Sequence, residues 1–221
     1  MIRFFLFSIK ELDYEKNDLN VPISTKRLIL GKLSRLVTNT IFLSHALREH
    51  IVIRILVSEP IKYLIQIKSE TIRYLGPEER SLGSILLKVK KSIEDKIQQN
   101  SMSKNWFEPN PGVLVKITEN FLEDIENELK EPSLFIKITN NQLEKNTNFF
   151  DLENELTILK QNYESVIFHF NLNVELDLLK PLASDISNQF KCIEINFTKK
   201  LDTNKLVSII NIVFDNIEIK K

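Results

Sequence analysis

The stretch SVIFHFN, residues 165–171, begins with a continuous apolar run, which is typical of a strand covered on both faces of its sheet. Similar runs lie on either side of it, and amphipathic segments of about 10–14 residues separate them. The expected strands are 113–117, 133–138, 165–171 and 192–197, and the expected helices are 119–129, within 152–163, 177–190 and 203–217. This alternation predicts an α/β fold with a largely parallel sheet covered by helices.

The N-terminal half adds further elements. Residues 2–9 predict a strand, and Ser24 or Thr25 can cap a helix that runs to about Phe42. Glu59-Pro60 separates two β-branched runs, 50–58 and 61–68, which predict a hairpin or adjacent strands. A second helix is expected to open at 76–79, with Pro77 in its first position, and the polar, Pro-rich stretch 98–112 predicts a long surface loop.

Apolar spacing predicts which helix faces are buried. The expected buried positions are Ile29, Leu33, Leu36, Thr40 and Leu43 in the first helix and Leu82, Ile85, Leu86, Val89, Ile93 and Ile97 in the second. Gly31 interrupts the first helix at a cost of about 1 kcal/mol relative to Ala. It therefore indicates a close approach, either by a neighbouring helix or by a ligand backbone.

Charge is unevenly distributed along a chain whose net charge is zero. The first 100 residues contain 17 Lys and Arg against 11 Asp and Glu, and residues 21–92 contain 13 against 5. A basic segment of this kind suggests a surface for polyanions, since Lys and Arg displace counterions from phosphates. Solvated helix faces are the alternative explanation.

Several classes of protein are not indicated. Cys192 is the one cysteine and the three histidines lie far apart, so neither a disulfide framework nor a local metal site is expected. The N-terminal apolar run is too short for a signal peptide or a membrane span, which predicts a cytoplasmic protein with no membrane partner. The chain contains no Gly-rich phosphate loop, no G-x-S-x-G and no C-x-x-C, and adjacency alone does not make Ser44-His45 a catalytic pair.

Arginines suggest where a polyanion would bind. Guanidinium groups suit bidentate phosphate contact, and the candidates are Arg27, Arg35, Arg48, Arg73 and Arg80, together with His45. Glu79 and Arg80 could supply a carboxylate base and a phosphate ligand, although Glu is also favoured at a helix N-terminus by the dipole alone. Trp106 is either a base-stacking residue or an aromatic anchor tucked into the fold.

Three segments resemble a known family. They are KRLILGKLSRLVTNTIFLSHALREH at 26–50, LGPEERSLGSILLKVKKSI at 75–93 and NWFEPNPGVLVK at 105–116. Their order and spacing resemble the archaeal tRNA (pseudouridine-54 N1)-methyltransferases of the SPOUT class, over roughly residues 1–140. The family phrases matched are the helix start at Lys26, the phrase around Ser44-His45, the Pro77-Glu78-Glu79-Arg80-Ser81 opening, and Trp106 with Pro111-Gly112.

The resemblance implies a SPOUT-like α/β domain over 1–221 with a C-terminal trefoil knot, a homodimer that binds S-adenosylmethionine in the knot, and tRNA as substrate. Residues 1–112 would form the RNA side and 113–221 the knot and cofactor region. Carried over to this sequence, the catalytic candidates are Arg27, Glu79 and Arg80. The RNA-binding candidates are Lys26, Arg35, His45, Arg48, Arg73 and Trp106. The cofactor-binding candidates are His169, Asn171, Asn173, Asn196 and Leu206.

The departures from the family pattern fall in the cofactor region. His169 and Asn173 stand where the family has glycines that let backbone approach the cofactor, and the loop at 195–206 has no Gly or Pro. Ile29 replaces an acidic residue at the start of the first helix. Two hypotheses follow: an active methyltransferase with a remodelled pocket, or a non-catalytic RNA-binding or structural dimeric partner protein. The departures favour the second.

Overall fold

The structure is a computed structural model that describes residues 2–20, 28–43, 46–99, 105–128, 133–139, 165–171, 190–196 and 202–219. Thirteen elements are described along these segments. They are β1 (Ile2–Ile9), η1 (Lys16–Asn20), α1 (Leu28–Ile41), β2 (Ile51–Val57), β3 (Tyr63–Lys68), α2 (Glu79–Gln98), β4 (Phe107–Asn110), β5 (Val113–Ile117), α3 (Phe121–Glu128), β6 (Ser133–Thr139), β7 (Ser165–Asn171), β8 (Phe190–Asn196) and α6 (Thr203–Ile219).

One sheet of eight described strands runs through both halves of the chain, in the order β4-β5-β3-β2-β1-β7-β6-β8. In the part of the sheet ordered β2-β1-β7-β6-β8, all neighbouring strands pair in parallel. Beyond β2, the strands β3, β5 and β4 are added in antiparallel pairs. The α/β class is confirmed. The sheet is mixed, however, because the hairpin β2–β3 reverses the strand direction, and β5 and β4 continue the antiparallel pairing beyond β3. In that hairpin Val57 lies opposite Tyr63, so of the two predicted alternatives, a hairpin or adjacent strands, the hairpin is observed.

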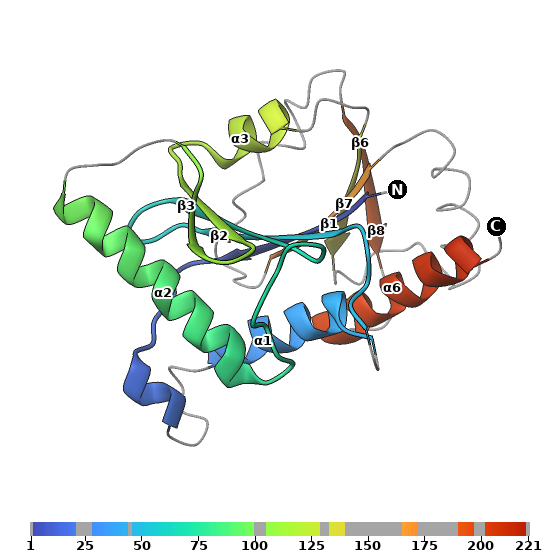
Figure 1. Cartoon of the computed structure of the whole chain (residues 1–221). Coiled ribbons are helices and arrows are strands. Elements are labelled where there is room, and N and C mark those ends of the chain that lie inside the picture. The colour runs from blue at the N-terminus through green and yellow to red at the C-terminus, as the bar shows by residue number, and fades with distance from the viewer. Residues whose placement is uncertain are drawn as a thin grey trace.

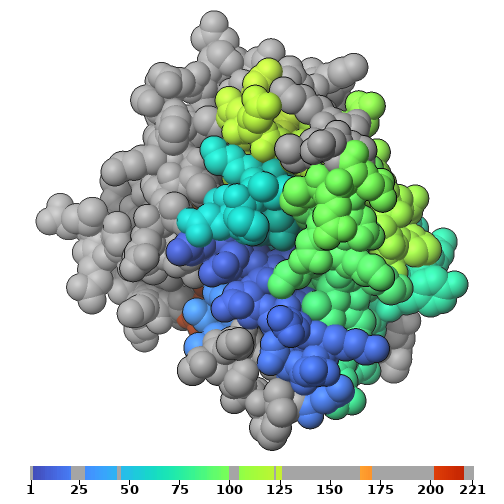
Figure 2. Space-filling view, turned by 90° about the vertical axis from the view of Figure 1, so that its left-hand side faces the viewer, coloured from blue at the N-terminus to red at the C-terminus, as the bar shows by residue number. Residues whose placement is uncertain are grey.

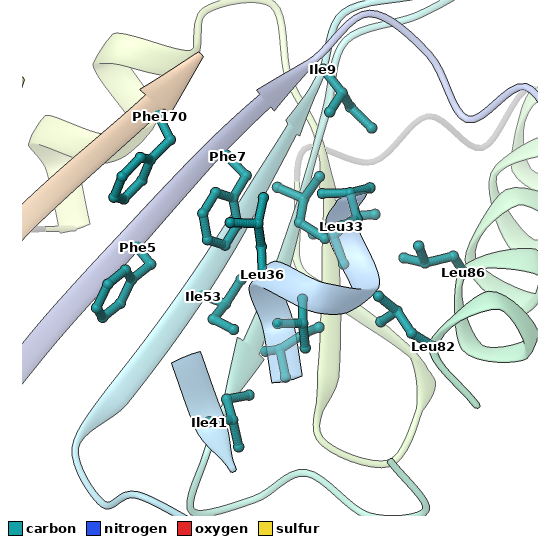
Figure 3. Packing of buried hydrophobic residues seen from close by; sticks show 14 of the residues in the cluster. Phe5, Phe7, Ile9, Leu33, Leu36, Ile41, Ile53, Leu82, Leu86 and Phe170 are labelled. Atoms are coloured by element: carbon teal, nitrogen blue, oxygen red, sulfur yellow. The ribbon is translucent and has the colours of Figure 1, made fainter. Parts of the chain in front are cut away.

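Helices cover the sheet unequally. In Figure 1, α1, α2 and α6 lie below the sheet and α3 lies above it. The larger core fills the lower layer, where Phe5, Phe7 and Phe170 from neighbouring strands meet Leu33 of α1 and Leu86 of α2 (Figure 3). A smaller core lies under α3 and includes Phe4, Leu6 and Phe121. Alternate side chains of β1 therefore pack into opposite layers, because successive residues of a strand point to opposite faces.

Several element boundaries differ from expectation. The stretch expected to be a loop contains the strand β4. Because β4 lies at the edge of the sheet, it can contain Pro109, which has no N–H to donate. Helix α2 begins at Glu79, so Pro77 precedes the helix. Leu43 and Ile97 were expected to be buried but are 46% and 36% exposed. The helix expected within 152–163 and residues 177–189 of the helix expected at 177–190 lie outside the described residues. Phe190, the expected last residue of that helix, instead begins β8.

The knot implied by the resemblance falls on segments that include 172–189 and 197–201, which also lie outside the described residues. Within the described chain, no helix combines the length and the apolar character needed to cross a bilayer.

The segment after β1 lies along α2, as the blue and green surfaces of Figure 2 show. The Tyr14 hydroxyl donates to the carbonyl of Gly83 at 2.9 Å, and Lys90 Nζ lies 3.5 Å from the Tyr14 carbonyl. A Cβ on Gly83 would lie 2.7 Å from Leu19 Cδ2, so the absence of a side chain lets η1 pack closely. This packing places the carbonyl of Leu19 beside the first turn of α2.

Candidate nucleic-acid interface

A cleft of about 170 Å³ lies between α1 and the start of α2. It is lined by Gly31, Ser34, Arg35, Thr38, Asn39, Pro77 and Glu79. The two helices and the segment between them thus bring hydroxyl, amide, guanidinium and carboxylate groups to one shallow surface. Such a set can bind a polar, hydrogen-bonding ligand group.

Gly31 and Thr38 explain how the two helices come together. A Cβ on Gly31 would stand 3.4 Å from Glu79 Oε2, so the approaching group is the side chain of a neighbouring helix. Thr38 Oγ1 donates to the carbonyl of Pro77 at 3.1 Å and joins α1 to the segment that leads into α2. Of the two explanations for Gly31, close approach of a neighbouring element is the one observed.

The turn into α2 is organised by Ser81. Its hydroxyl oxygen accepts a hydrogen bond from the Gly76 N–H at 2.7 Å and the hydroxyl donates to the Tyr74 carbonyl at 3.2 Å. The Arg73 N–H donates to the carbonyl of Pro111 at 3.2 Å. These bonds hold residues 73–76 against both the first turn of α2 and the β4–β5 turn.

Three of the nominated arginines surround this first turn. Arg35 comes from α1, Arg73 from the preceding turn and Arg80 from α2 itself, and all three side chains are exposed. Arg73 Nη1 bonds to the carbonyl of Ile72 and Arg80 Nε bonds to the carbonyl of Leu19, both at 3.2 Å. Among the described residues none of the three forms an ion pair.

Arg48 has a different environment. Its Nη1 donates to the carbonyls of Asn39 and Phe42 at 3.0 and 2.8 Å, and its Nε donates to Asp215 Oδ2 at 3.1 Å. Asp215 Oδ1 also accepts a bond of 2.9 Å from Arg3, which is 2% exposed. Arg48 therefore joins the end of α1 to α6, and most of its donors are used within the protein.

Trp106 lies on the other layer. It is half-buried against the smaller core under α3, and Lys116 Nζ lies 6.0 Å from its ring centroid. The sheet separates it from the arginines at α2. Lys26, Arg27 and His45 lie outside the described residues.

The residues predicted to bind the cofactor lie in different environments. Asn171 and Asn196 end β7 and β8, at the carboxyl edge of the parallel strands, where open α/β sheets usually bind ligands. His169 is 2% exposed, and its Nε2 lies 2.9 Å from Ser8 Oγ on the neighbouring strand β1. Asn173 lies outside the described residues.

Leu206 belongs to the opposite layer from His169. It is 1% exposed within the larger core, with Val207 and Phe214 of the same helix. His169 alternates with Phe168 and Phe170, so its side chain lies on the face under α3. Two of the nominated side chains are thus buried on opposite faces of the sheet. Among the described residues, these candidates do not form a common cradle for S-adenosylmethionine.

Two buried tyrosines lie beside α2. Burial raises the pKa of the Tyr14 phenol above its ordinary value, and the charges of Tyr63 and Glu79 raise it further. Burial likewise raises the pKa of the Tyr63 phenol, with a contribution from Glu94. Both phenols are therefore neutral near pH 7 and pack in the core, and that of Tyr14 also donates a hydrogen bond. Within the described segments no cluster of His, Cys, Asp or Glu has the composition of a metal site.

Sequence reasoning missed two residues that the structure makes conspicuous. Ser8 lies within an otherwise apolar strand, and its contact with His169 depends on the pairing of β1 with β7. Tyr74 is 84% exposed and has a positive φ of 62°. Its position two residues before Gly76-Pro77 could have drawn attention to it, because such dipeptides mark turns with unusual backbone angles.

The comparison with known proteins gives a partial match. The tRNA (pseudouridine(54)-N(1))-methyltransferase of Methanococcoides burtonii is 38% identical to this chain over 94 residues. The matched region covers 40% of this chain and 44% of the relative, so the chain spans less than half of that protein's length. No protein-family profile matches the chain.

Proposed function

We propose that this protein binds tRNA through the first turn of α2 and is a tRNA methyltransferase-like protein. The observation that carries the proposal is the group of exposed guanidiniums at this turn, Arg35, Arg73 and Arg80, which form no ion pair with the described residues. The partial relative supports it, since that protein is named for a reaction on tRNA.

The physical argument rests on phosphate recognition. A guanidinium presents a planar set of N–H donors that fits phosphate oxygens, and its charge releases counterions from the RNA. The three arginines come from two helices and the turn that joins β3 to α2, which Figure 1 shows passing beside α1. Because Ser81 and Pro111 hold that turn, the guanidiniums are carried on an ordered backbone.

The proposal is tested by measuring the binding of a tRNA transcript by fluorescence anisotropy over a range of salt concentrations. Arg35→Ala and Arg80→Ala are each expected to weaken binding about fivefold to tenfold and to lower the salt slope by about one. Lys10→Ala is the matched control, because Lys10 is an exposed cation that pairs with Glu59 away from α2. Unchanged affinity in both arginine variants would contradict the proposal.

Methyl transfer to RNA is the second candidate, favoured by the name of the partial relative. Methyltransferases usually take the methyl group from S-adenosylmethionine. The cofactor candidates within the described segments do not converge, so no catalytic step is assigned to that group. Among the residues that line the cleft, Glu79 is the one able to accept a proton. The cationic groups predicted to act with it are Arg80 and Arg27, and Arg27 lies outside the described residues.

Cofactor binding separates the two candidates. A methyltransferase is expected to melt at higher temperature with millimolar S-adenosylmethionine, by mass action on the folded state. In that case Glu79→Gln should retain tRNA affinity and lose methyl incorporation. Salt-sensitive tRNA binding with no effect of the cofactor on melting would leave the non-catalytic RNA-binding function.

A further inference from the structure

Tyr74 is an exposed aromatic residue whose backbone is strained. It is 84% exposed, and its φ of 62° lies in the left-handed region that residues other than Gly occupy at a cost. Among the described residues its ring contacts no other aromatic ring and its hydroxyl has no hydrogen-bond partner. Neither burial nor bonding of the side chain accounts for a tyrosine at this position.

The backbone around Tyr74 is fixed from three directions. The Ser81 hydroxyl donates to its carbonyl at 3.2 Å, and the Arg73 N–H before it donates to Pro111. Further along the turn, the Pro77 carbonyl accepts from Thr38 of α1. The ring is thus carried by an anchored turn, which lowers the entropy lost when a ligand is bound.

The chemistry beside the ring indicates the ligand. Arg73 precedes Tyr74, and Arg80 lies in the turn of α2 that holds the Tyr74 carbonyl through Ser81. An aromatic face next to guanidiniums is the combination that proteins use for unpaired nucleotides: the base stacks on the ring and the cations contact the backbone phosphates. Because two exposed arginines belong to the same turn as this exposed ring, a nucleotide suits the surface better than an apolar protein segment.

We propose that Tyr74 is a stacking platform for an unpaired base of RNA, with Arg73 and Arg80 contacting the adjoining phosphates. This inference rests on the proposed tRNA-binding function and deepens it by assigning a residue to base contact. Stacking has no sequence requirement, since every base offers a π-face. The ligand is therefore defined as an unpaired nucleotide in a loop, whatever its base.

The test uses the full chain, the tRNA transcript above and a single-stranded oligouridine. Tyr74→Ala is expected to weaken binding of both RNAs about tenfold without changing the salt slope, because stacking neutralises no phosphate. Tyr74→Phe should bind like the wild type, since it keeps the ring. Tyr74→Leu should bind as weakly as Tyr74→Ala, and Ile212→Ala, which alters an exposed apolar residue of α6, should have no effect.

A stability measurement supplies an independent readout. Tyr74→Gly relieves the positive φ, so it should raise the melting temperature while losing RNA affinity. A structural role for the ring predicts the opposite change in melting temperature.

The outcomes are distinct. If the wild type binds tRNA with its arginine dependence and Tyr74→Ala binds equally well, the stacking inference is overturned and the proposed function stands. If Tyr74→Leu retains affinity, the contact is a generic apolar one, as for a protein partner, and the inference is overturned as well. If the wild type binds neither RNA, both proposals fail together.

Discussion

Gly112 shows at the scale of one residue how the turn near Tyr74 is built. Its φ is 77°, and a Cβ at this position would overlap the backbone of Thr71 and Ile72. The N–H of Gly112 donates to Glu108 Oε1 at 2.7 Å. The β4–β5 turn can therefore approach the segment after β3 only because this residue has no side chain.

Gly112→Ala is expected to lower the free energy of unfolding by about 2 kcal/mol or more, since both the backbone angle and the contact become unfavourable. Urea unfolding measures the loss. Gly31→Ala is the control: its Cβ would meet Glu79 Oε2 at an ordinary 3.4 Å, and Ala is the better helix former by about 1 kcal/mol. Equal effects in the two variants would refute this account of Gly112.

Tyr14 and Tyr63 make stability depend on alkaline pH. Burial raises the pKa of both phenols in the folded state, whereas in the unfolded chain they lose their protons near pH ~10. Above about pH 10 the unfolded state therefore binds fewer protons than the folded state, and the free energy of unfolding falls as the pH rises. Below about pH 10 this contribution is fully present.

Urea unfolding at several pH values above and below about pH 10 tests this dependence. Tyr14→Phe should make the alkaline decline shallower, and it should cost about 1 kcal/mol at neutral pH through loss of the bond to Gly83. An alkaline decline as steep in Tyr14→Phe as in the wild type would contradict the assignment.

At the scale of elements, the end of α1 is stabilised by two side chains from outside the helix. The last carbonyls of a helix have no partners within it, and Arg48 and Asn211 donate to the carbonyls of Asn39 and Thr40. Asp215 of α6 forms ion pairs with both Arg48 and Arg3 of β1. One polar cluster thus joins α1, β1 and α6.

Arg48→Ala is accordingly expected to lower the free energy of unfolding by about 2 kcal/mol, because charged hydrogen bonds and one partner of Asp215 are lost. Arg35→Ala should change it by less than about 0.5 kcal/mol, since that side chain is exposed. Chemical denaturation of the two variants distinguishes an arginine that stabilises the fold from one available to RNA. Little loss of stability in Arg48→Ala would restore Arg48 as an RNA-binding candidate.

At the scale of the whole molecule, the two halves of the chain share one sheet. Strand β1 lies between β2 from the first half and β7 from the second, and Phe214 of α6 packs edge-on against Phe168 at 5.6 Å between ring centroids. A fragment of residues 1–112 would leave the edge of β1 and the apolar face under α6 uncovered.

The fragment 1–112 is therefore expected to lack a cooperative thermal transition, whereas the full chain should unfold cooperatively. Circular dichroism at increasing temperature compares the two. A cooperative transition in the fragment would show that the basic half is an independent folding unit.

The elements that could be predicted are those with a local signal. Apolar spacing located α1, α2 and α6, and continuous apolar runs located β5, β6 and β7, because side-chain periodicity follows directly from helix and strand geometry. Strand β4 was missed because Pro109 and its polar neighbours are typical of a loop. It is a strand only because β5 lies alongside, with Phe107 opposite Val115.

The candidate site could be predicted only in part. The basic segment and the Pro-Glu-Glu-Arg-Ser opening of α2 pointed to the surface where Arg35, Arg73 and Arg80 lie. Sequence proximity could not show that Arg48 bonds to the end of α1, or that Trp106 lies across the sheet from the arginines. These assignments depend on which face each side chain occupies.

The sequence by itself determined the α/β class, most helix and strand positions and the basic character of the α1–α2 region, since these depend on composition and short-range periodicity. The tertiary structure alone decided that the sheet is mixed, that His169 and Leu206 lie on opposite faces, and that Tyr74 is exposed in a turn anchored to α2. The physical reason is that strand pairing and backbone hydrogen bonds between distant segments, such as those of Ser81, Pro111 and Thr38, set which side chains are buried and which remain available to a ligand.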